Sequence, residues 1–194
     1  YLRNDLPMND AAMRGMELFY GDAGCSSCHS GRFQTDHDFH AIAIPQIGPG
    51  KGARFESHAR DTGRMRVTGR IEDAYAFRTP TLRNIEHTAP YGHSGAYATL
   101  EGIVRHHLNP VESLKNYDST QIVMPGFEAY DLRIISDPVE LDLIAAANSL
   151  IPVDLSDNQV ADIIMFLKAL TDPQSVRGAL GIPQIIPSGL PVAR

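Results

Sequence analysis

The chain has 194 residues, of which 43% are hydrophobic and 21% are charged, as in an ordinary globular protein. Its net charge of −6 argues against nucleic acid as a partner, and no apolar run approaches the roughly 20 residues that span a bilayer. The chain starts at Tyr1 and not at an initiator methionine or a signal peptide, so we expect a processed product, whose signal peptide has been removed, or a fragment. The 16 glycines and 13 prolines are widely spread, which predicts helices joined by long ordered loops.

The first predicted helix covers residues 11–20. Asn9 or Asp10 can accept hydrogen bonds from the free N–H groups of its first turn. Apolar residues then recur at helical spacing, and Gly21 is a suitable C-terminal cap. The helix therefore leads directly into residues 25–29, which read Cys-Ser-Ser-Cys-His. A helix followed at once by this motif is the usual start of a class I cytochrome c-like fold.

Cys25 and Cys28 are followed directly by His29. This Cys-x-x-Cys-His order is typical of covalently attached haem c, in which both thiols add to the haem vinyl groups and the histidine binds iron. Three alternatives are weaker. A redox dithiol normally lies in a βαβ unit, a zinc site needs two more ligands, and a disulfide here would close too small a loop to stabilise much. The sequence predicts one haem c and, because haem c is attached outside the cytoplasm, a periplasmic location.

Residues 30–60 show no sustained periodicity and are predicted to form loops. They contain three histidines that could contact a metal or a haem propionate, although polar surroundings favour surface positions for His37 and His58. Arginines in and after these loops could neutralise the propionates through bidentate pairs. The candidates are Arg54, Arg60, Arg64 and Arg66.

Two linked motifs occur in residues 77–95, which read FRTPTLRN and then TAPYGHSG. They match, in order and spacing, a Phe-x-x-Pro-x-Leu-Arg-Asn segment followed by Thr-Ala-Pro-Tyr-x-His-x-Gly. On these motifs the chain resembles the C-terminal haem domain of the bacterial di-haem cytochrome c peroxidase and MauG-like family. The loop at residues 45–50 and the segment at residues 187–191 are also similar to MauG-like members.

The resemblance implies roles for three residues of the second motif. In this family the Thr-Ala-Pro backbone helps to bind a calcium ion between two haem domains, which implies Thr88 and Pro90. Free carbonyls of a tight turn suit a hard cation, and a plain turn explains the same residues equally well. The family's Pro-Tyr-x-His histidine lies close to the haem but does not bind its iron. The resemblance implies the same position for His93.

The second axial ligand is predicted on a helix over residues 100–107, ended by Asn109-Pro110. At about 100° per residue, His107 continues the apolar face that begins at Leu100, whereas His106 falls toward the polar side. The resemblance agrees, since the family's distal ligand lies fourteen residues after the Pro-Tyr-x-His histidine. We therefore predict bis-histidine ligation by His29 and His107, with His106 and Met124 as the alternatives.

The C-terminal part of the chain carries one more strong helix signal. Weak helical patterns in residues 138–150 precede a capping box at residues 156–159. An apolar stripe then continues to Leu170, and this helix is expected to cross the first one. We predict a mainly α haem domain over residues 1–172 and a Pro-rich tail over residues 173–194.

A haem with two strong ligands has no open coordination position, which favours electron relay over catalysis on this chain. The first hypothesis is the electron-transfer half of a di-haem peroxidase-like or MauG-like oxidoreductase. Its partners would be a second haem domain or subunit and a small electron-donor protein, and a homodimer is left open. The second hypothesis is a stand-alone mono-haem carrier without catalytic activity.

Overall fold

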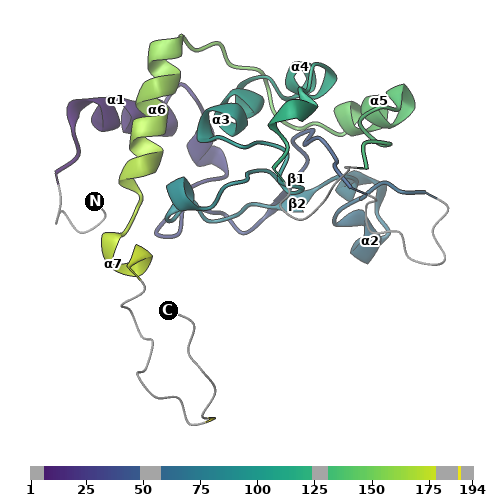
Figure 1. Cartoon of the computed structure of the whole chain (residues 1–194), viewed down its shortest axis with the longest axis horizontal. Coiled ribbons are helices and arrows are strands. Elements are labelled where there is room, and N and C mark those ends of the chain that lie inside the picture. The colour runs from purple at the N-terminus through teal and green to yellow at the C-terminus, as the bar shows by residue number, and fades with distance from the viewer. Residues whose placement is uncertain (1–6, 49–57, 124–130, 178–187, 189–194) are drawn as a thin grey trace.

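The computed structural model describes residues 7–48, 58–123, 131–177 and 188. Its architecture is mainly α, as predicted, with helices joined by long irregular segments (Figure 1). The helices are α1 (Asp10–Tyr20), α2 (Met65–Thr68), α3 (Leu100–Leu108), α4 (Pro110–Lys115), α5 (Pro138–Ala146), α6 (Asp157–Ala169) and α7 (Pro173–Val176). Single 3₁₀ turns are η1 (Cys25–Ser27), η2 (Ile71–Asp73), η3 (Ile85–His87) and η4 (Ser119–Gln121).

The predicted caps of the two principal helices are present. The Asn9 side chain accepts a hydrogen bond from the backbone N–H of Ala12 (2.8 Å), and the Gly21 N–H closes the end of α1. At the start of α6, Ser156 and Gln159 bond to each other's backbone in a complete capping box. The N-terminal contacts satisfy N–H groups that a helix start leaves without partners, and the Gly21 N–H satisfies the Leu18 carbonyl at the end of α1.

Helices α1 and α6 cross in close contact, as expected from the sequence (Figure 1). The approach is closest at Gly15, where a Cβ atom would lie 1.9 Å from the carbonyl oxygen of Asp162. Beside it, the rings of Phe19 and Phe166 pack with centroids 5.1 Å apart, and both side chains are buried. The crossing fixes the helix that leads into the cysteine motif.

The buried apolar residues form two clusters. The larger lies beneath α1, α3 and α6, and the smaller beneath α4, α5 and the two short strands. The segment over residues 41–47 serves both, since Ala41 and Ala43 belong to the smaller cluster whereas Ile44 and Ile47 belong to the larger. This segment therefore joins the two halves of the molecule.

Within its described residues, 30–48 and 58–60, the predicted loop contains one short strand. Strand β1 (Phe39–His40) pairs antiparallel with β2 (Phe77–Arg78), with Phe39 opposite Arg78. The tail predicted from residue 173 starts with α7, which is capped by the Asp172 side chain; beyond Arg177, the structure describes Ser188 alone. Among the described residues, no helix is long and apolar enough to cross a bilayer.

Candidate functional site

The cysteine motif forms a tight turn directly after α1. Gly24 begins it in the left-handed region (φ +66°), which a side chain at this position would disfavour. The carbonyl oxygen of Cys25 then accepts hydrogen bonds from the N–H groups of Cys28 (3.4 Å) and His29 (3.0 Å). Both thiols are free and partly buried. The turn thus presents two thiols and an imidazole within five residues.

The thiols lack the electrostatics of a redox dithiol. Burial raises the pKa of Cys25 to about 11 and also raises the pKa of Cys28. Redox-active Cys-x-x-Cys pairs instead depend on a lowered pKa, because the thiolate is the reactive form. The environment of the pair therefore disfavours the dithiol alternative and is compatible with thiols that are consumed by haem attachment.

The imidazole of His29 is held by one nitrogen. Its Nδ1–H donates to the backbone carbonyl of Gln34 (3.2 Å), because a carbonyl can only accept. Gln34 is itself buried and its side-chain amide bonds to Tyr20 and Gly31. Burial, followed by the nearby His107, lowers the pKa of His29 to about 4. The ring is therefore neutral at pH 7, with its Nε2 lone pair available to a metal.

His107 faces His29 from helix α3. Its Nδ1–H donates to the carbonyl of Ile103 (2.8 Å), one turn earlier, and burial lowers its pKa. The two ring centroids are 6.3 Å apart at an interplanar angle of 60°. Two metal–imidazole bonds of about 2 Å each, plus the distance from each nitrogen to its ring centre, also span roughly 6 Å. Within the described part of the chain, no hydrogen bond occupies Nε2 of either ring.

The neighbouring histidine is not where the sequence predicted it. His106 was expected on the polar side of the helix, but it is fully buried, with 0% exposure. Its Nε2–H donates to the carbonyl of Ile42 (2.7 Å), and its Nδ1 accepts from the Tyr97 hydroxyl (2.7 Å). The prediction was wrong because Ile42, which is 64 positions away in sequence, lies against this side of α3. Neither nitrogen is left for iron, and Met124, the other alternative, lies outside the described residues.

His93 lies in a hydrogen-bonded pair of its own. Its Nε2 is 3.0 Å from Oδ2 of Asp61, and its ring stacks on Phe77 with centroids 3.7 Å apart. Asp61 is buried and fixed, since its backbone N–H and carbonyl both bond to the Gln46 side chain. The structure thus gives His93 two protein partners, Asp61 and Phe77.

Thr88 and Pro90 lie on an exposed turn joined by a cis Ala89–Pro90 peptide bond. The N–H of Thr88 donates to the carbonyl of Ile85 (3.2 Å). Across the described ranges, neither the Thr88 nor the Pro90 carbonyl accepts a backbone hydrogen bond. Both oxygens therefore remain as acceptors of the kind that calcium prefers.

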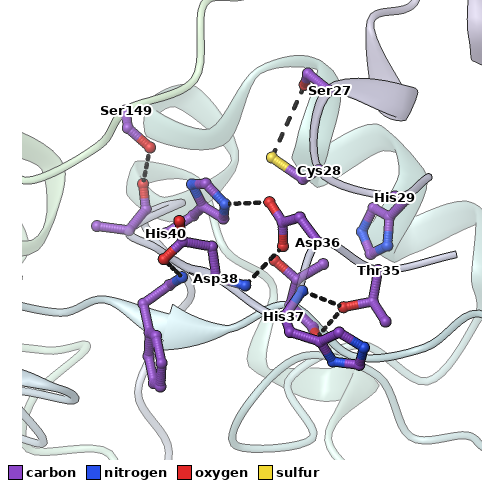
Figure 2. Close-up of polar contacts among 12 residues, drawn as sticks. Ser27, Cys28, His29, Thr35, Asp36, His37, Asp38, His40 and Ser149 are labelled. Atoms are coloured by element: carbon purple, nitrogen blue, oxygen red, sulfur yellow. Dashed lines mark hydrogen bonds and ion pairs between the residues drawn. The ribbon is translucent and has the colours of Figure 1, made fainter. Parts of the chain in front are cut away.

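A cluster that the sequence analysis did not assemble lies beside Cys28. The carboxylate of Asp36 is 2.8 Å from Nε2 of His40 and lies next to the Cys28 sulfur (Figure 2). Burial acts to raise the pKa of Asp36, but hydrogen bonds from His40 and the backbone of Asp38 lower it to about 2. Such a thiol, carboxylate and imidazole set suits a soft divalent metal. Haem attachment would use the same sulfur, and the Cys-x-x-Cys-His turn is the more specific signal.

Three of the four propionate candidates, Arg60, Arg64 and Arg66, have partners within the protein. Arg60 forms a 2.6 Å ion pair with Glu140, and Arg64 lies over the Phe39 ring at 4.1 Å and pairs with Asp73 at 3.5 Å. Arg66 lies on α2, and Arg54 is outside the described residues. These three arginines could therefore pair with a haem propionate only if their present contacts rearranged.

Sequence relatives of the chain come from one group of haem enzymes. Cytochrome-c peroxidase IdrP1 of Denitromonas iodatirespirans is 34% identical over 50% of this chain and 31% of its own length. The methylamine utilization protein MauG of Methylophilus methylotrophus is 32% identical over 74% of this chain and 37% of its own length. These relatives are members of the di-haem cytochrome c peroxidase and MauG family, and the chain is homologous to them. It spans about a third of the length of these relatives, and a scan of protein-family models finds no match.

Solved structures of the same family share the fold. A MauG-like protein associated with microbial copper homeostasis superposes with a TM-score of 0.59 at 27% identity, covering 90% of this chain and 50% of that one. The di-haem peroxidase BthA of Burkholderia thailandensis gives a TM-score of 0.57 at 21% identity, covering 88% of this chain and 44% of that one. Homology to the peroxidase and MauG family supports a haem-based redox role for this chain.

Proposed function

We propose that the chain is a six-coordinate haem c domain that relays electrons within a di-haem peroxidase-like or MauG-like oxidoreductase. Cys25 and Cys28 would hold one haem covalently, and His29 and His107 would both bind its iron. The observation that carries the proposal is the 6.3 Å separation of these two rings. Both rings are oriented through Nδ1, which leaves Nε2 of each ring without a hydrogen bond in the described part of the chain.

A bound haem would supply one-electron transfer between ferric and ferrous iron. The chain's own contribution is to hold the two imidazoles neutral and fixed. Burial disfavours protonation of both rings, which keeps their lone pairs available at neutral pH. Because two strong ligands leave no coordination position for peroxide, oxidative chemistry is assigned to a second haem domain or subunit.

Several further assignments accompany this proposal. His93 would stabilise the haem surroundings through its contacts with Asp61 and Phe77. Thr88 and Pro90 would offer carbonyl oxygens to calcium at the surface where the second haem domain docks. A small electron-donor protein, a periplasmic location and removal of a signal peptide complete the proposal, with residues 1–172 as the haem domain and residues 173–194 as its tail.

The ligand assignment is tested on the haem-loaded chain by absorption and electron paramagnetic resonance spectroscopy. We expect one covalent haem per chain, a low-spin ferric signal of bis-histidine type and no far-red methionine band. His107→Gln should produce a high-spin haem that binds carbon monoxide, whereas His87→Gln, which changes an exposed histidine on η3, should leave the spectra unchanged. A wild-type spectrum from the His107 variant would refute the assignment.

The enzyme and carrier hypotheses differ in what accompanies the chain. The chain spans about a third of the length of its curated relatives, so the enzyme hypothesis requires a second haem domain or subunit to accompany it. Native mass and haem content of material purified from the source cell should then reveal a second haem bound with this chain, together with peroxide turnover. A species with one haem and no turnover would favour the stand-alone carrier.

A further inference from the structure

His106 takes no part in the proposed ligation, yet the protein fixes both of its ring nitrogens. Nε2 donates to Ile42 and Nδ1 accepts from Tyr97, each at 2.7 Å. The two bonds require a single neutral tautomer, so the ring has one orientation in which both are made. A fully buried imidazole held in this way is a fixed point of the fold, because breaking either bond leaves a buried polar group without a partner.

The first partner, Tyr97, is itself held on several sides. Its hydroxyl, having donated to His106, accepts from Ser113 on α4 (2.9 Å). Its backbone pairs with Tyr91 through bonds of 2.7 and 3.0 Å, and its side chain is buried. The ring also packs against Gly102 on α3, where a Cβ would lie 3.1 Å from it. Because Tyr97 is held on these sides, its hydroxyl fixes the position of the His106 ring relative to α4 and to Tyr91.

The second partner, Ile42, belongs to the segment that comes after the cysteine motif. The preceding residue, Ala41, is anchored by Ser149, whose N–H and hydroxyl both donate to the Ala41 carbonyl at 2.8 and 2.9 Å. The bond between His106 and Ile42 thus ties helix α3 to the joining segment over residues 41–47, downstream of His29.

We propose that His106 is a positioning residue that sets the orientation of the axial ligand His107. Consecutive helical residues project about 100° apart, so a helix whose rotation is fixed at His106 directs His107 into one sector. The bond from His107 to Ile103 lies within α3 and orients the ring without fixing the helix relative to the rest of the protein. The inference rests on the proposed binding of iron by His107.

The test compares variants of the haem-loaded full chain. Tyr97→Phe removes one hydroxyl and keeps the packed ring, and His106→Gln replaces the imidazole with an amide that cannot reach both partners. His87→Gln is the control. We expect the first two variants to shift the low-spin resonance signal and the midpoint potential, and to accelerate entry of carbon monoxide about tenfold. The control should change none of these quantities.

The outcomes separate this inference from the proposed function. Unchanged spectra, potential and carbon monoxide entry in Tyr97→Phe and His106→Gln would overturn the positioning role, even if stability falls. If His107→Gln abolishes the bis-histidine signal while the other two variants keep it, the ligand assignment stands and the positioning role fails. If His107→Gln retains the wild-type signal, the ligand assignment itself fails. Should His106→Gln not load haem, Tyr97→Phe decides alone.

Discussion

Gly15→Ala is predicted to be strongly destabilising because it inserts a methyl group where two helices touch. The new Cβ would lie 1.9 Å from the Asp162 carbonyl oxygen, whereas ordinary van der Waals contact begins at 3.4 Å. The helices would therefore have to separate by about 1.5 Å, and the contacting atom is backbone, which cannot rotate away. We expect a loss of about 3 kcal/mol in the free energy of unfolding, at the upper end of overpacking effects.

The assay is urea denaturation of the haem-loaded chain followed by circular dichroism, with thermal unfolding as a second measure. For a chain of this length the predicted loss corresponds to a decrease of roughly 10 °C in Tm. Arg14→Ala is the matched control, because Arg14 is a neighbour on α1 and bonds to the same Asp162 through a solvent-exposed bidentate pair. The control should have a much smaller effect. Equal effects, or a Gly15→Ala loss below about 1 kcal/mol, would refute the argument from close packing.

Three further outcomes are expected. Phe166→Ala should cost about 3–5 kcal/mol in denaturation experiments, since its fully buried ring packs on Phe19, whereas Val176→Ala at an exposed site should be nearly neutral. His107→Met should raise the midpoint potential in a redox titration, because a thioether favours ferrous iron more than an imidazole does. Burial lowers the pKa of His106 to about 3. Between pH 6.5 and 3 this histidine is therefore protonated in the unfolded chain and neutral in the folded chain. Stability should fall by up to about 1.4 kcal/mol per pH unit between pH 6.5 and 3, and His106→Gln should reduce this slope in urea titrations.

Local patterns predicted the helices well because their signals are local. The Asn9 cap, the Gly21 end and the Ser156 capping box each involve residues within four positions, and all are present. The sequence could not predict that residues 41–47 pack into two different apolar clusters. This packing depends on which distant helices lie on either side.

The contrast between His106 and His107 shows the same limit within one helix. Helical periodicity placed His107 on the apolar face, and the structure brings it to within 6.3 Å of His29. The same periodicity placed His106 toward solvent, where it would be exposed if α3 were isolated. A backbone carbonyl and a tyrosine from other segments cover that side, and neither carries a sequence signal that points to His106.

The raised pKa of the Cys25 thiol has a consequence for how the protein is made. At pH 7 a thiol with a pKa of about 11 is ionised in only about one molecule in ten thousand. Because the thiolate is the nucleophile, a folded chain without haem would be a poor substrate for thioether formation. If the proposed haem is attached covalently, its attachment is therefore expected to precede closure of the fold. The folded, haem-free chain should react slowly with iodoacetamide at Cys25, and urea should accelerate the reaction.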